Sequence, residues 1–99
     1  MQEIEINLSG ITDQEKIERV IEAACLAQDL RRTIKGSLQQ CPGCVHWHYR
    51  KPGTSGTLEI TYWPEENRCW FPFRDGRAKS WVAEMMDVLK VEIEKQVTQ

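Results

Sequence analysis

The chain has 99 residues, of which 40% are hydrophobic and 28% charged, with a formal net charge of −2 at pH 7. This composition excludes a disordered tail and predicts a single α+β domain over residues 1–99. No apolar run approaches the ~20 residues of a membrane-spanning helix, so we expect no membrane contact. The first residues are acidic rather than basic and then apolar, so we expect no signal peptide and a cytoplasmic location.

The first third of the chain is predicted to form a strand and a long helix. Residues 3–8 alternate between apolar and polar side chains, which indicates a half-buried strand. Thr12 and Glu15 fit a capping box, and a helical apolar stripe follows them. Gly36 is a good C-terminal stop, so we predict one helix over residues 13–35. Its apolar stripe is wider than a surface helix needs, which favours either a covering loop or a self-association surface.

Residues 45–73 are predicted to form three short antiparallel strands, because their apolar side chains alternate with a period of two. Segments 52–56 and 64–67 have the composition of turns. We pair Trp63 with Arg68 in the second hairpin and Arg50 with Thr57 in the first. With these two registers, one set of apolar side chains lies on a single face of the sheet. A slip of one residue would turn this set outward, so the agreement supports the register. The set consists of Val45, Trp47, Tyr49, Leu58, Ile60, Tyr62, Cys69, Phe71 and Phe73.

A second helix is predicted over residues 77–97, where apolar residues recur every three or four positions. The expected order is therefore β-α-β-β-β-α, with an antiparallel sheet of three to four strands and two helices packed on one face. Two helices can cover only the apolar face of this sheet. The other face is expected to be open and to carry His46, His48, Glu59, Thr61, Trp63, Arg68, Trp70 and Pro72.

This open face is the candidate binding surface, because aromatic residues and arginine are enriched in interface cores. In the predicted register Glu59 lies across from His48, and Arg68 lies against Trp63 as a cation–π pair. We expect a small non-enzymatic domain that binds an unknown protein partner or a second copy of itself. The competing interpretation is that a terminal strand or loop covers this face. The binding residues proposed are His46, His48, Glu59, Trp63, Arg68 and Trp70.

Catalysis is not favoured, although His48 and Glu59 could form an acid–base pair. The sequence shows no nucleophile with an orienting partner, no glycine-rich phosphate loop and no carboxylate cluster. Cross-strand His–Glu pairs on exposed sheets are usually surface electrostatics.

The four cysteines are expected to be reduced or to ligate a metal, because we expect no signal peptide. Cys41 and Cys44 form a CxxC motif, and His46 follows closely. These three residues would supply three ligands of a structural zinc site, with His48 able to replace His46. Cys69 is predicted to point to the other face of the sheet, so the fourth ligand is missing. We therefore expect no cofactor and keep zinc as an alternative; a redox dithiol is less favoured, because the motif precedes a strand rather than a helix.

Arg74, Arg77 and Lys79 gather at the start of the second predicted helix. Together with the order α-β-β-β-α over about residues 13–97, they loosely resemble the double-stranded-RNA-binding domain. In that family, basic residues at this helix start contact phosphates. The chain departs from the family because Asp75 interrupts the cluster, the net charge is negative and the sheet carries an aromatic face. Nucleic-acid binding is therefore an alternative that the charge disfavours.

Overall fold

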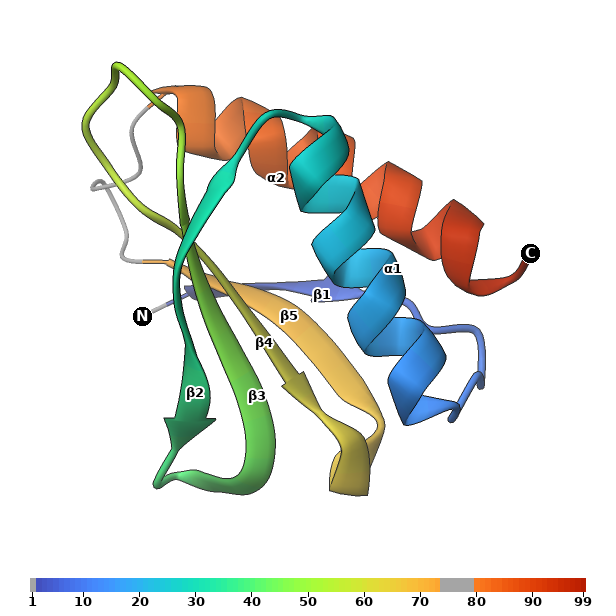
Figure 1. Cartoon of the computed structure of the whole chain (residues 1–99). Helices are drawn as coiled ribbons and strands as arrows, with labels where there is room; N and C mark the ends of the chain where they lie inside the picture. Colours follow the sequence, from blue (N-terminus) through green and yellow to red (C-terminus); the bar gives the residue numbers. More distant parts are fainter. Residues whose placement is uncertain (1, 74–79) are drawn as a thin grey trace.

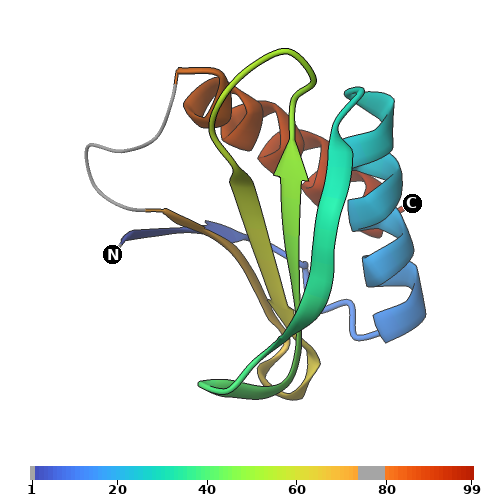
Figure 2. The same cartoon turned by 60° about the vertical axis from the view of Figure 1, so that its left-hand side comes forward.

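A computed structural model of the chain describes residues 2–73 and 80–99. Five strands form one antiparallel sheet in the order β1-β5-β4-β3-β2, and both helices lie on the same face of it (Figures 1 and 2). The α+β class and the placement of the helices are as predicted. The elements are β1 (Gln2–Ile6), α1 (Gln14–Ala27), β2 (Arg31–Leu38), β3 (Cys41–Arg50), β4 (Leu58–Trp63), the 3-10 helix η1 (Pro64–Glu66), β5 (Arg68–Phe73) and α2 (Ser80–Val97).

The predicted helix over residues 13–35 is wrong in its last third, residues 28–35. Helix α1 ends at Ala27, and the chain turns at Asp29, which has a left-handed φ of 59°. The following residues, Arg31–Leu38, form β2 and pair with β3. The outer edge of β3 offers unpaired backbone groups, and pairing them outweighs the helical pattern of this segment. The order is therefore β-α-β-β-β-β-α, and the sheet has five strands rather than three or four.

The predicted register of the two central hairpins is confirmed. On β3 and β4, Val45 lies opposite Tyr62 and Trp47 lies opposite Ile60. The predicted pair of Trp63 with Arg68 joins β4 to β5. Strand β1, which the sequence could not place, pairs with the outer edge of β5. The predicted alternation therefore assigns the side chains of the central strands to their two faces.

The core lies between the sheet and the two helices. Trp47, Leu58, Ile60 and Phe71 have no exposed surface, and Tyr62 is buried beside them. The helices contribute the other half of this layer, through the buried side chains of Ile17, Ile21, Ala24, Cys25, Val82, Met86, Leu89, Ile93 and Val97. Burial of this continuous apolar layer is the main force that holds the helices on the sheet. In the described part of the chain, no helix is long and apolar enough to cross a membrane.

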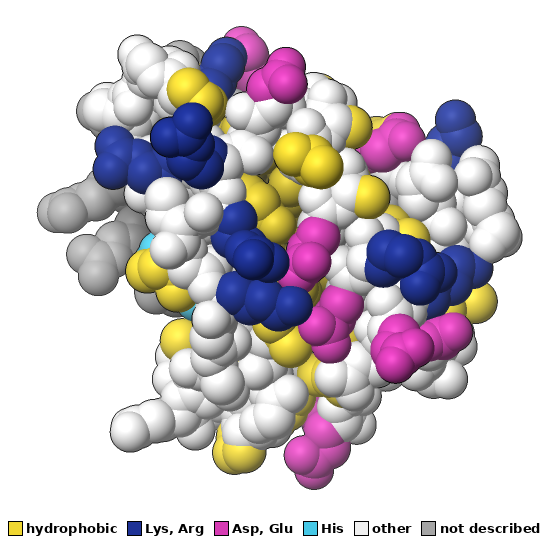
Figure 3. All heavy atoms as spheres, viewed as in Figure 1, with side chains coloured by type: hydrophobic (Ala, Val, Ile, Leu, Met, Phe, Trp, Pro, Cys, Tyr) yellow, Lys and Arg dark blue, Asp and Glu magenta, His cyan; other side chains and the backbone are white. Residues whose placement is uncertain are grey.

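Charged side chains line the boundary between α1 and β2, where Figure 3 shows acidic and basic groups side by side. Glu22 Oε2 lies 2.8 Å from Lys35 Nζ and 3.3 Å from Arg32 Nη1. Trp47 Nε1 also donates a hydrogen bond to this carboxylate, over 3.0 Å. Burial raises the pKa of Glu22, but the hydrogen bonds from Lys35 and Trp47, with the nearby cationic charges, bring this pKa below its ordinary value. These contacts hold β2 and β3 against α1.

Candidate functional site

The sheet face that lies away from the helices is hollowed into a groove of about 390 Å³. All five strands contribute side chains to this groove, so it crosses the sheet rather than following one strand. The sequence predicted an open face, and the structure shows on that face a groove with a partly buried floor. Its lining consists of Glu3, Leu38, Gln40, Cys41, His46, Glu59, Thr61, Trp63, Arg68, Trp70 and Pro72.

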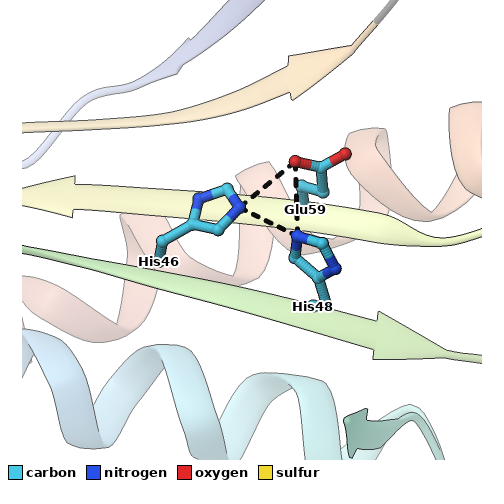
Figure 4. Close-up of side chains that lie close together, drawn as sticks. All are labelled: His46, His48 and Glu59. Atoms are coloured by element: carbon cyan, nitrogen blue, oxygen red, sulfur yellow. Dashed lines mark hydrogen bonds and ion pairs between the residues drawn. The ribbon is translucent and has the colours of Figure 1, made fainter. Parts of the chain in front are cut away.

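Three metal-ligating side chains converge at the groove: His46, His48 and Glu59 (Figure 4). The Nε2 atoms of the two histidines lie 3.0 Å apart. Glu59 Oε1 lies 3.2 Å from His46 Nε2 and 3.5 Å from His48 Nε2. The strand geometry brings them together, because residues two apart share a face and Glu59 pairs directly with His48 across β3 and β4. The predicted opposition of His48 and Glu59 is therefore confirmed.

Thr61 holds the ring of His46 from its other side. His46 Nδ1 and Thr61 Oγ1 are hydrogen-bonded over 2.7 Å, and the two residues are cross-strand partners. Thr61 has no exposed surface, and His46 is 7% exposed. This buried hydrogen bond fixes the ring so that Nε2 points toward His48 and Glu59.

Arg68 lies at the other side of the groove and contacts Trp70, not Trp63. Its guanidinium carbon lies 4.5 Å from the centre of the Trp70 ring, so the predicted partner of the cation–π pair was wrong. Although Arg68 pairs with Trp63 in the backbone register, its side chain reaches toward β1 and forms ion pairs with Glu3 and Glu5. The hydrogen bond to Glu5 is the main cause that raises the pKa of Arg68 above its ordinary value.

The two tryptophans differ in their surroundings. Trp70 is only 8% exposed and belongs to the floor of the groove. Trp63 is half-buried, and its Nε1 donates a hydrogen bond of 3.1 Å to the carbonyl oxygen of Pro42. Trp63 is therefore the tryptophan that an incoming ligand reaches more easily.

The predicted zinc ligands Cys41, Cys44 and His46 do not come together as a metal site. The two cysteines are joined to each other as a disulfide, and both are buried. The expectation of reduced thiols at this motif was therefore wrong, because CxxC spacing at the start of a strand also lets the two sulfur atoms meet. Within residues 2–73 and 80–99, the metal-ligating group that the structure assembles is that of His46, His48 and Glu59. The sequence predicted the register that pairs these strands and indicated His46, His48 and Glu59 as binding residues, but the predicted metal site grouped His46 with the two cysteines and not with Glu59.

The remaining two cysteines lie on the helix side of the sheet, as expected. Burial raises the pKa of the Cys25 thiol to about 12. Cys69 has no exposed surface, and burial raises its pKa well above the ordinary value. Both thiols are therefore protonated packing groups at neutral pH rather than nucleophiles.

The basic residues proposed as an alternative nucleic-acid site, Arg74, Arg77 and Lys79, lie outside the residues that the structure describes. The resemblance to the double-stranded-RNA-binding domain was based partly on three strands between the two helices. Among the residues that the structure describes, four strands lie there, so this topological part of the resemblance was wrong. No family model, curated protein or solved structure matches the chain. Arguments about function therefore start from the groove itself.

Proposed function

We propose that this chain is a non-enzymatic binding domain that holds a short segment of a partner protein in the groove. The observation that carries this proposal is the chemistry of the outer sheet face. In a two-layer fold, that face is usually polar and solvated. Here it gathers Trp63, Arg68 and Trp70 around a hollow, and these are the residue types that dominate the centres of protein interfaces.

The dimensions and charge of the groove favour a short, weakly charged segment. A volume of about 390 Å³ lies within the ~300–1,000 Å³ typical of ligand sites and accommodates a few side chains. At the rim, Arg68 is already paired with Glu3 and Glu5, so this guanidinium offers no free positive charge to an acidic partner segment. An apolar or aromatic side chain of the partner would pack against the accessible face of Trp63.

A peptide library displayed on phage and selected on the immobilised full chain tests this proposal. The affinity of an enriched peptide is then measured by fluorescence anisotropy for the wild type and for Trp63→Ala. We expect binding to weaken at least tenfold in this variant, the scale of a lost interface anchor. Leu26→Ala is the matched control, because Leu26 is 73% exposed on α1, away from the groove.

The same peptide, added to isotopically labelled protein, should shift backbone amide NMR signals along β3, β4 and β5. Signals that move only on α1 and α2 would contradict the proposal. A dimer seen by light scattering and lost in Trp63→Ala would show that a second copy, rather than another protein, occupies the groove. Trp63 alone is replaced, since Trp70 is 8% exposed and its removal would also cost stability.

A further inference from the structure

We infer that His46, His48 and Glu59 form a binding site for one divalent transition-metal ion. The inferred ligand atoms are Nε2 of each histidine and Oε1 of the glutamate. This inference goes beyond the proposed function, because it depends on the convergence of these three atoms and not on the tryptophans. It also replaces the zinc site predicted from Cys41, Cys44 and His46.

The separations of the three atoms match those of ligands that share one ion. They are 3.0 Å between the two nitrogen atoms, and 3.2 Å and 3.5 Å from these to the carboxylate oxygen. Three atoms with these separations lie on a circle of about 1.9 Å radius, so one ion with bonds of about 2.1 Å would sit about 0.9 Å above their plane. These separations therefore allow one ion to lie within bonding distance of all three atoms.

The backbone holds these ligands in place before any ion binds. His46 and His48 are alternate residues of β3, and Glu59 is the cross-strand partner of His48 on β4. The site therefore sits on two paired central strands rather than on a loop, which favours a fixed geometry. Because the fold supplies this geometry, we expect the ion to add stability without being required for folding.

Thr61 supplies the supporting contact that metal-bound histidines usually have. A ligating imidazole normally donates its second N–H to a nearby oxygen, which fixes the tautomer that binds the ion. His46 meets this requirement, since its Nδ1 lies 2.7 Å from the buried Thr61 Oγ1. When Nδ1 donates this bond in a neutral ring, the lone pair of Nε2 points at the cluster.

The three atoms already contact one another through the groups that an ion would use. The two Nε2 atoms are hydrogen-bonded to each other at 3.0 Å, and Glu59 Oε1 lies 3.2 Å from His46 Nε2. A bound ion would replace these contacts and accept a lone pair from each of the three atoms.

The donor set selects the class of ion. Two imidazoles and one carboxylate suit Zn²⁺, Fe²⁺, Co²⁺ or Ni²⁺, whereas Mg²⁺ and Ca²⁺ prefer oxygen ligands. Three protein ligands leave at least one coordination position for water or for an atom of a bound ligand. His46 and Glu59 also line the groove, so this position is next to the space that we assign to the partner segment.

Calorimetric titration with Zn²⁺, and absorption spectroscopy with Co²⁺, test the inference on protein that carries no affinity tag. Both are performed in a Cys41→Ser, Cys44→Ser background, so that the CxxC motif cannot bind the ion if its disulfide is reduced. We expect one ion per chain, cobalt bands in the visible range, a rise in the melting temperature and no response to Mg²⁺. His48→Gln and Glu59→Gln should each weaken Zn²⁺ binding by at least about 100-fold, and Thr61→Val by about tenfold.

Glu66→Gln is the matched control, since it removes the same charge at an exposed position in η1 and should leave Zn²⁺ affinity unchanged. The inference is overturned if the Cys41→Ser, Cys44→Ser protein binds no stoichiometric ion, or if His48→Gln binds Zn²⁺ as tightly as its parent. Trp63→Ala should keep its metal affinity while losing the selected peptide. Failure of the peptide experiment and failure of the metal experiment therefore remain distinguishable.

Discussion

The two faces of the sheet are made from the same strands but are held together by different forces. On the helix side, Trp47 and Ile60 are fully buried among apolar neighbours. On the groove side, the adjacent residues His46 and Thr61 are also buried, but as a hydrogen-bonded pair. One face is stabilised mainly by removal of apolar surface from water, and the other by specific polar contacts. The comparison indicates that stability comes mainly from the first face, whereas the second face holds the candidate site.

The largest expected effect comes from a cavity on the helix side. Ile60→Ala should lower the free energy of unfolding by about 3 kcal/mol, because Ile60 has no exposed surface. Urea denaturation followed by circular dichroism measures this loss. Thr61→Val, one residue away on the groove side, should cost about 1–2 kcal/mol, because it leaves the buried Nδ1 of His46 without this hydrogen bond. Equal losses in the two variants would mean that the two faces do not differ as described.

A smaller effect is expected at the rim of the groove. Trp63→Ala removes a half-buried ring and the hydrogen bond from its Nε1 to Pro42. We expect a loss of about 1.5 kcal/mol in the free energy of unfolding, less than for Ile60→Ala, with an unchanged circular dichroism spectrum. Trp63→Phe keeps an aromatic ring but loses the indole N–H donor, so the loss of stability should be about half as large. An unfolded Trp63→Ala would place this residue in the core.

The smallest effect is expected at Glu22, on the boundary between α1 and β2. Its pKa is lower in the folded chain than the ordinary value of 4.5, so its contribution is present above that value and is lost as pH falls through the folded pKa. Glu22→Gln should therefore reduce stability by less than about 1 kcal/mol at pH 7 and by almost nothing near pH ~3. Thermal melts over this pH range measure the difference. A loss that is as large in acid as at neutral pH would indicate a packing effect instead.

Much of the fold could be predicted, because the alternation of apolar and polar side chains strongly constrains the register of the central strands. Trp47, Ile60 and Phe71 can be buried together in one register only, and the structure has that register. Strand β2 could not be predicted in this way, since its residues from Arg31 to Ser37 are exposed and show no buried pattern. Its conformation is decided by pairing with β3, a tertiary contact that local sequence does not encode.

The candidate site was predicted in its members but not in its arrangement. The register alone places His48 opposite Glu59, and His46 on the same side. Whether the three polar atoms meet depends on side-chain rotamers and on the hydrogen bond to Thr61, which the sequence does not specify. For the CxxC motif, the sequence shows that the two cysteines lie close together but not what they form. The same spacing of Cys41 and Cys44 suits both a disulfide and a zinc site.

The exposure of β2 has a consequence for how copies of this protein meet. It is a terminal strand of the sheet, so one row of its backbone donors and acceptors has no neighbouring strand. Arg31, Arg32 and Lys35 are exposed on this strand, and the last two form ion pairs with Glu18 and Glu22 on α1. Three cations beside two carboxylates leave this edge with a net positive charge, so continuous sheets that run through several molecules are discouraged. Raising the salt concentration would weaken this protection, which makes ionic strength a variable to control when the protein is concentrated.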